Sequence, residues 1–315
     1  MDPLSDVLTL LNIGGAYSSR FEATGRWALR FQGYRHIKVG AAVSGSCLIT
    51  VDGTPAVTLS EGDCYLLTGG RPYEVADGPD AEPVDGHDVY LRAPDPRNVR
   101  YGTAGPDAAR TVLVGGSITL DDTSAALLLD CLPPIARVPS GSPQARVLRP
   151  LLAMLADEAT GEPLGAEIMN ENLTRILFVQ TLRAHLAGAR DVPGWLGALN
   201  DPQIGAALAL MHQQATRRWT VASLAGQVGL SRSAFAQRFR SLVGLPPLDY
   251  LTHWRIRSAA RALRTGDRTV ASVAAEWGYA SESAFSNAFK RVTGHPPSRY
   301  RDAGPIPAAA PPLAG

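Results

Sequence analysis

The sequence predicts an α+β protein of two domains, a β-rich N-terminal domain and an all-α C-terminal domain. Short runs of β-forming residues, broken by Gly, Pro and Asp, fill the first third of the chain. Apolar residues with helical spacing take over after residue 145. A pattern beginning at Thr220 then recurs 49 residues later, at Thr269. At 315 residues the chain is long enough for two domains, each with its own core.

The N-terminal third is expected to form closely spaced short strands. Two-residue turn signals stand at Asp52-Gly53 and around Gly62. Short strands with such turns are typical of a sandwich or a small barrel. Residues 77–108, rich in Asp, Pro and Gly, are predicted to be a long loop. The predicted strands are 27–31, 37–43, 47–51, 56–59, 65–67 and 111–114.

Residues 139–195 are predicted to be a helical segment that follows a hinge at 139–143. The hinge contains two prolines and a glycine, and helical spacing begins a few residues after it. In the helix expected at about 167–187, apolar residues surround most of the circumference, so more than one face must be buried. One face can serve its own domain and another a subunit interface, which predicts a homodimer. A core helix in a monomer is the alternative.

Each copy of the repeat is predicted to be a helix, a short turn and a second helix. In the first copy Thr220 caps one helix, Gly229 makes the turn and Ser231 caps the next helix. Phe235, Phe239 and Leu242 form the buried stripe of that second helix, and the second copy carries the same roles at Thr269, Gly278, Ser281, Phe285, Phe289 and Val292. This is the helix-turn-helix arrangement, whose second helix enters the DNA major groove.

A helix from about 248 to 264 connects the two copies. A rigid helix of that length would hold the two recognition helices at a fixed separation, and successive major-groove turns lie roughly 34 Å apart. A generic helical bundle is the alternative. Two copies with matched caps and matched aromatic residues argue against it.

Charge is divided unevenly along the chain. Residues 196–301 carry 14 Lys and Arg against 5 Asp and Glu, whereas residues 1–195 carry 16 against 23. A basic module attached to an acidic body is typical of a phosphate-binding domain. Charge alone is weak evidence, and double-stranded DNA is the expected partner because the repeated helix-turn-helix accompanies it.

The C-terminal third resembles the AraC/XylS DNA-binding domain along residues 203–301. Residues 2–195 resemble the cupin-type sensor of one branch of that family, from the first helix through Gly62-Asp63 to Leu132-Pro133. The resemblance implies a transcription regulator with a β-barrel sensor, a dimerising helical segment and RNA polymerase as a partner. The matching C-terminal residues are Leu224, Ala225, Gly229, Ser231, Phe235, Phe239, Gly244, Pro247, Tyr250, Arg255, Ala259, Gly278, Tyr279, Ser281, Phe285, Phe289, Lys290, Gly294, Pro297, Tyr300 and Arg301.

The DNA-facing residues follow from helical geometry if the phenylalanine stripes face the core. Side chains on the opposite face of each recognition helix are predicted to read bases, and these are Arg232, Ser233, Gln237, Glu282, Ser283 and Asn287. Relatives commonly have Arg where this chain has Gln237 and Asn287, and these amides match adenine rather than guanine. Phosphate contacts are predicted for Thr220, Arg240, Arg255, Arg257, Thr269, Lys290 and Arg291. A solvated helix face is the alternative for each residue.

The sensor is predicted to bind neither metal nor cofactor and to lack enzymatic activity. A catalytic cupin needs histidines on adjacent strands, but residues 37–43 contain no His-x-His and Tyr73 stands where relatives often have His. His36 and His87 have no obvious partner. A barrel interior lined by Trp27, Tyr65 and Tyr73 suits a small, largely apolar effector. Three separated cysteines, Cys47, Cys64 and Cys131, predict neither a disulfide framework nor a zinc cluster, and buried packing is favoured over redox sensing.

The predicted domains are a sensor at 1–138, the helical segment at 139–195, the DNA-binding domain at 196–301 and a disordered tail at 302–315. An acidic N-terminus and the lack of an 18-residue apolar stretch predict a cytoplasmic protein. Two alternatives stay open: a constitutive DNA-binding protein whose barrel only oligomerises, and a cupin enzyme fused to a DNA-binding domain.

Overall fold

The computed structural model describes residues 2–11, 15–34, 37–102, 109–120, 122–158, 164–189, 192–266 and 268–302. These form two compact units. The sheet unit comprises the described parts of 13–120 and 132–190, and the helical unit those of 1–12, 121–131 and 191–302. Each unit is described by itself.

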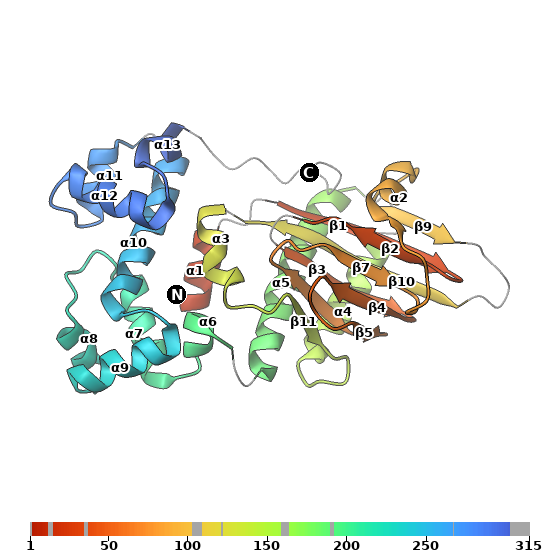
Figure 1. Cartoon of the computed structure of the whole chain (residues 1–315), viewed down its shortest axis with the longest axis horizontal. Helices are drawn as coiled ribbons and strands as arrows, with labels where there is room; N and C mark the ends of the chain where they lie inside the picture. The colour runs from red at the N-terminus through yellow and green to blue at the C-terminus, as the bar shows by residue number, and fades with distance from the viewer. Residues whose placement is uncertain are drawn as a thin grey trace. The chain divides into compact units, whose positions relative to one another are not determined.

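The sheet unit is built from two sheets (Figure 1). The six-stranded sheet has the order β11 (Ile135–Val138), β6 (Cys64–Thr68), β3 (Ile37–Ser44), β10 (Arg110–Thr119), β1 (Gly15–Thr24) and β9 (Asn98–Gly102). The five-stranded sheet has the order β5 (Val57–Ser60), β4 (Ser46–Val51), β7 (Tyr73–Ala76), β2 (Ala28–Phe31) and β8 (Val84–Asp85). Most neighbours are antiparallel, and β9 and β8 join their sheets in parallel.

The core of the sheet unit contains residues from both sheets, because alternate residues of each strand point to the same face. Its buried members include Phe21 and Leu113 of one sheet and Ile49 and Val75 of the other. The two-sheet architecture and its enclosed core confirm the predicted cupin-like β domain.

Gly40 of β3 is required by the position of the Tyr65 ring. A Cβ atom at residue 40 would lie 2.6 Å from the Tyr65 hydroxyl oxygen, well inside contact distance. The phenol ring therefore occupies the space into which a longer side chain at position 40 would project.

Two helices of the sheet unit pack together and against the six-stranded sheet, namely α4 (Ala145–Glu158) and α5 (Ala166–Gly188). The buried face of α5 includes Leu173, Leu177 and Phe178. Large apolar side chains are also left exposed on the two helices, and these are Val147, Met154, Ile168, Met169 and Ile176. The helix predicted at about 167–187 corresponds to α5, and α4 lies where helical spacing was predicted to begin.

The helical unit contains α6 (Gly194–Ala198), α7 (Pro202–Gln213), α8 (Val221–Gln227), α9 (Arg232–Val243), α10 (Pro247–Thr265), α11 (Val270–Glu276), α12 (Glu282–Thr293) and α13 (Pro297–Asp302). Figure 1 shows α10 running between a group formed by α7, α8 and α9 and a group formed by α11, α12 and α13. The predicted connecting helix is thus confirmed. No helix in the described ranges is long and apolar enough to cross a membrane.

Two helices from the N-terminal part of the chain belong to the helical unit. These are α1 (Pro3–Leu10) and α3 (Asp122–Leu129). Val7 and Leu11 at the start of the chain are fully buried there. The indole nitrogen of Trp195 in α6 donates to the Leu127 carbonyl oxygen at 2.6 Å. The helical unit is therefore built from three separated stretches of the chain. The predicted domains were continuous ranges.

Two local predictions are wrong. Residues 77–108 are not one long loop, because they contain β8, β9 and the helix α2 (Gly86–Arg92), which Asp85 caps. The hinge predicted at 139–143 lies inside the sheet unit. The buried carboxylate of Asp63 fixes it by accepting hydrogen bonds from the Ser140 amide at 2.7 Å and from the Arg137 guanidinium at 2.7–2.9 Å.

Candidate nucleic-acid interface

The first helix-turn-helix is formed by α8 and α9, and a side chain caps one backbone amide at the start of each helix. The Thr220 hydroxyl accepts from the Ser223 amide at 3.0 Å, and the Ser223 hydroxyl accepts from the Thr220 amide at 2.9 Å. Ser231 caps α9 through the Ala234 amide. Between the helices, Gly229 has a φ of +70°, which favours glycine. These contacts fix where the recognition helix begins.

The second helix-turn-helix, α11 and α12, repeats this construction. Thr269 accepts from the Ser272 amide at 3.1 Å, and Ser281 accepts from the Ala284 amide at 3.2 Å. Gly278 has a φ of +80°. Phe285 and Phe289 are fully buried against α10 residues, as the predicted stripe requires.

In the first copy the buried stripe is Phe235, Phe239 and Val243, whereas Leu242 is only partly buried. The prediction of Leu242 was one residue off at the C-terminal end of the helix. The two phenylalanines still set the outward face.

All six predicted base readers are exposed. They are Arg232, Ser233 and Gln237 on α9 and Glu282, Ser283 and Asn287 on α12. The Ser233 hydroxyl lies 3.3 Å from the Ser231 hydroxyl, and Ser283 lies 3.1 Å from Ser281 in the same way. Ser233 and Ser283 therefore lie next to the capping serines in the first turn of their helices. The amides of that turn that remain free favour the binding of phosphate.

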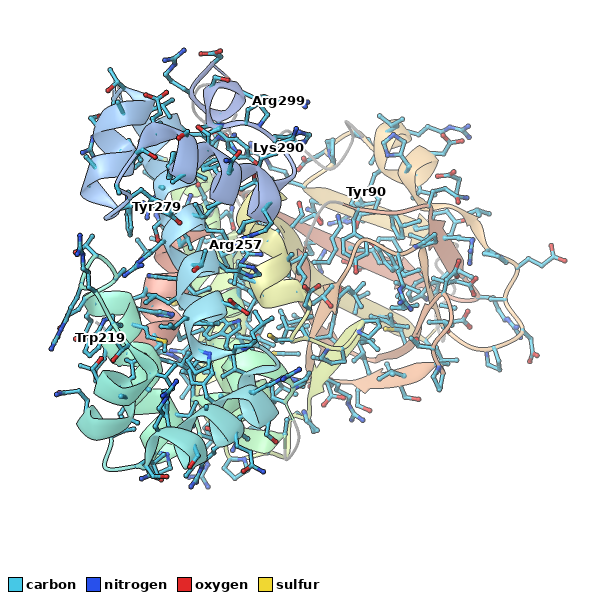
Figure 2. The ribbon with its side chains drawn as sticks, turned by 60° about the vertical axis from the view of Figure 1, so that its left-hand side comes forward. Tyr90, Trp219, Arg257, Tyr279, Lys290 and Arg299 are labelled. Atoms are coloured by element: carbon cyan, nitrogen blue, oxygen red, sulfur yellow. The ribbon has the colours of Figure 1, made fainter. Side chains whose placement is uncertain are left out.

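Five of the predicted phosphate contacts are exposed as well, namely Thr220, Arg240, Thr269, Lys290 and Arg291. Figure 2 shows Lys290 on α12 of the helical unit. In each copy the cap threonine and a cation of the recognition helix thus remain available to a phosphate backbone.

Comparison with known proteins assigns the family. A cupin profile matches residues 2–187, and a helix-turn-helix domain profile matches residues 224–303. A putative AraC-like transcription regulator of Streptomyces lividans is 45% identical over 303 residues, covering 96% of this chain and 98% of the relative. The chain belongs to the AraC-like transcription regulators. The regulator AlkR of Acinetobacter baylyi is 30% identical, covering 96% of this chain and 99% of its own.

Among solved structures, this AraC-like regulator is similar to the DNA-binding domain of AdpA in complex with a target DNA. The identity is 36%, and the match covers 33% of this chain and 92% of that domain, with a TM-score of 0.31. The relatives from Streptomyces lividans and Acinetobacter baylyi are both named as transcription regulators.

Two predicted phosphate contacts of the regulator are held by other groups. Arg255 donates to the carbonyl oxygens of Ala215 at 2.5 Å and Arg217 at 2.7 Å, so its guanidinium ties α10 to the chain before α8. Arg257 on α10, labelled in Figure 2, is largely buried near Tyr250 and Tyr300, and this burial lowers its pKa. Because both arginines serve the interior of the helical unit, we leave them out of the proposed phosphate set.

Two further cations precede the first cap and were not predicted. Arg217 and Arg218 are exposed immediately before Trp219 and Thr220. The Arg217 guanidinium lies 4.1 Å from the Trp219 ring centroid, which orients it, and Trp219 is labelled in Figure 2. The two consecutive arginines before the helix cap at Thr220 were the feature of the sequence that could have indicated these cations.

The three residues predicted to line an effector pocket lie together in the core of the sheet unit. Trp27 packs edge-on against Phe21 with a centroid distance of 5.2 Å, and Tyr73 stacks on Phe31 at 4.8 Å. Tyr65 packs against the same cluster. The three rings therefore belong to one cluster within the described part of the sheet unit.

The described part of the sheet unit offers poor ligands for a metal. Within the described ranges no group of three His, Cys, Asp or Glu side chains is arranged to hold an ion. His87 stands at the start of α2, and His36 lies outside the described residues. Burial raises the pKa of the Cys47 and Cys64 thiols to about 12, which disfavours the thiolate that metals bind.

We therefore expect the purified protein to be metal-free. Untagged protein should contain less than about one tenth of a metal ion per chain by elemental analysis, because a bound ion needs three or four protein ligands. Stoichiometric zinc, iron or nickel that disappears when His36 or His87 is replaced would refute this expectation.

Proposed function

We propose that this regulator reads DNA with α9 and α12, each contributing one amide side chain to base recognition. The observation that carries the proposal is the equivalent, exposed position of Gln237 and Asn287 on two identically capped helices. Both side chains stand opposite the buried phenylalanines that anchor their helix. A side chain so placed extends into the major groove when the helix docks there.

The chemistry of the amides defines the expected base. An Asn or Gln side chain accepts from adenine N6 and donates to adenine N7, and guanine does not offer that pair. Arg232 near the start of α9 matches guanine instead. Glu282 at the start of α12 carries a negative charge that phosphate repels. These differences support stronger base reading by α9 than by α12.

The test separates base reading from backbone binding. Gln237→Ala and Asn287→Ala should each flatten the preference at one A·T position by about 1–3 kcal/mol, while the salt dependence of binding stays nearly unchanged. Lys290→Ala should weaken binding to all sequences alike and reduce the slope of log K against log salt by about one, because one phosphate contact is lost. Binding-site selection and salt titrations measure the two effects.

Arg299→Ala serves as a control, because Arg299 lies on α13 rather than on a recognition helix and its guanidinium is within hydrogen-bond distance of His295 Nδ1, at 3.1 Å. We expect it to leave the selected motif unchanged. If both amide variants recover the wild-type motif, neither residue reads a base and the proposal fails.

We further propose that a small, largely apolar effector bound in the sheet unit controls DNA binding. Support comes from the aromatic lining by Trp27, Tyr65 and Tyr73, whose rings belong to one cluster. The alternative, a constitutive regulator whose barrel only oligomerises, requires no such ligand.

We propose homodimerisation through α4 and α5. The exposed apolar side chains on these helices support it, because large apolar groups gathered on a surface mark an interaction site. As a promoter-bound regulator the protein would act in the cytoplasm with RNA polymerase as its partner, an expectation that rests on the family alone.

A further inference from the structure

The inner face of the six-stranded sheet carries a lysine, Lys38 of β3. Residues that pair across two strands, and every second residue along one strand, lie on the same face of a sheet. Lys38 pairs with Leu67 of β6, and the next pair on that face is Gly40 with Tyr65. Leu67 and Tyr65 belong to the core cluster that contains residues of both sheets. The Lys38 side chain therefore enters the interior of the sheet unit, not the face that α4 and α5 cover.

The ammonium of Lys38 has no counterion in the described part of the chain. No ion pair or hydrogen bond joins it to another described residue, and the side chain is partly buried. Burial lowers the pKa of Lys38 to about 8, so most of the side chain is still protonated at pH 7. A charge that leaves water is costly unless an opposite charge or hydrogen bonds compensate it. The ammonium therefore lacks the partner that would compensate its burial.

Two hydroxyl groups stand beside this ammonium on the same face. Ser117 of β10 pairs with Lys38 from the strand opposite β6, and it is partly buried. The Tyr65 phenol lies over Gly40, as its close approach to that position shows. Burial raises the pKa of Tyr65, so its hydroxyl remains a hydrogen-bond donor. Three neighbouring strands thus bring one positive charge and two hydroxyl groups to adjacent positions.

The groups next to the lysine on its other side are apolar. Leu67 pairs with Ile135 of β11, so the row that contains Lys38 and Ser117 continues as aliphatic side chains. Ile135 and Tyr65 pack against the core cluster. All of these residues except Leu67 are only partly buried, so they keep surface that a ligand can contact.

The charge and the neighbouring side chains define the class of ligand. One ammonium balances one negative charge, whereas a phosphate monoester would bring a second charge into apolar surroundings. A carboxylate has two oxygens, which can accept from an ammonium and from hydroxyl groups at the same time. An apolar body fits the aliphatic and aromatic side chains beside the charge.

We propose that the sheet unit binds a small carboxylic acid with an apolar body, whose carboxylate pairs with Lys38 and accepts from Ser117 and Tyr65. This inference rests on the effector proposed above for the sheet unit and names its chemical class. A neutral apolar effector would leave the ammonium of Lys38 uncompensated.

The test uses the full-length protein with hexanoate, benzoate and phenylacetate as probes, and with the matching primary amides as uncharged probes of the same shape. We expect at least one acid, at about 10 mM, to raise the thermal unfolding temperature, because a ligand that binds only the folded state stabilises it. Calorimetry should then show that the matching amide binds about tenfold more weakly or worse, since it lacks the charge-assisted contact with Lys38.

Lys38 can be observed directly because the chain contains two lysines, Lys38 and Lys290. Protein labelled with carbon-13 at lysine Cε gives one NMR signal from each, and Lys290→Arg assigns them. The acid should shift the Lys38 signal and leave the Lys290 signal unchanged. Lys38→Met removes the charge but keeps an unbranched side chain, so acid and amide should bind this variant equally. Lys290→Arg is the matched control and should keep the preference for the acid.

The results separate this proposal from the proposed effector. If the amides bind the wild type as tightly as the acids, an effector site exists but the carboxylate proposal is overturned. It is also overturned if an acid binds without shifting the Lys38 signal, or if Lys38→Met keeps the preference for the acid. If neither acids nor amides stabilise the wild type, both proposals fail.

Discussion

Phe239→Ala is expected to lower the free energy of unfolding of the helical unit by about 3–5 kcal/mol, because the truncation leaves a large cavity. Phe239 is fully buried and contacts Phe235 and Tyr250 at centroid distances of 5.6 and 5.8 Å. It anchors α9 to α10. A loss of this size is a large part of the stability of an ordinary domain, so DNA binding should fall with it. Urea unfolding and operator binding measure the two effects.

The neighbouring residue supplies the control. Arg240 is exposed, and Arg240→Ala should change the free energy of unfolding by no more than about 0.5 kcal/mol while still weakening DNA binding. Phe289→Ala, at the equivalent position of the second copy, should match Phe239→Ala in its effect on stability. A loss below about 1 kcal/mol for both phenylalanine variants would mean that the phenylalanines do not anchor the recognition helices.

Adjacent residues of α5 should respond in opposite ways to a negative charge. Leu177 is fully buried, so Leu177→Glu should prevent folding of the sheet unit, since an unpaired buried charge costs several kcal/mol. Ile176 is 48% exposed, and Ile176→Glu should leave the monomer folded but remove the proposed dimer. Sedimentation combined with circular dichroism distinguishes unfolding from dissociation.

Thr174 and Ile168 provide the comparison along the same helix. Ile168→Glu, on the exposed side, should reproduce the effect of Ile176→Glu, whereas Thr174→Glu, on the buried side, should resemble Leu177→Glu. A soluble dimer in both exposed-side variants would exclude this face as the subunit interface.

The helical unit was largely predictable because its signals are local. Caps at Thr220, Ser231, Thr269 and Ser281 each stand three residues before the amide they bind, and the apolar spacing follows directly. The second copy of the helix-turn-helix repeats the same caps and the same apolar spacing, which supported each helix predicted in the first copy. The off-by-one error at Leu242 arose at a helix end, where either neighbour satisfies the spacing.

Several strands escaped prediction because their patterns are weak. The alternation of β1 is interrupted by Ser18, Ser19 and Arg20, yet the strand pairs with β10 along its full length, from Gly15 with Thr119 to Thr24 with Arg110. Pairing of that kind is non-local and leaves no trace in a short window. The same holds for β9, which follows a run rich in Asp and Pro.

Within the candidate sites, the sequence predicted which side chains are exposed but not which groups they contact. Helical geometry placed Gln237 and Asn287 on the surface correctly. It could not reveal that Arg255 would be captured by two carbonyl groups about forty residues earlier in the chain. Nor could it bring Lys38 next to Ser117, because side chains so far apart in the sequence are associated only by the tertiary fold.

The assignment of α1 and α3 to the helical unit has a consequence for how such genes can recombine. Three separated stretches of coding sequence contribute to the DNA-binding module, and two of them flank the first ten strands of the sensor. A crossover near codon 190 would transfer α6 to α13 from the donor gene without the donor's α1 and α3. The chimera would keep the α1 and α3 of the recipient. Every chimera of this kind must seat foreign helices where Val7, Leu11 and Leu128 are now buried. The sequences of α1 and α3 are therefore expected to change together with those of α6 to α13.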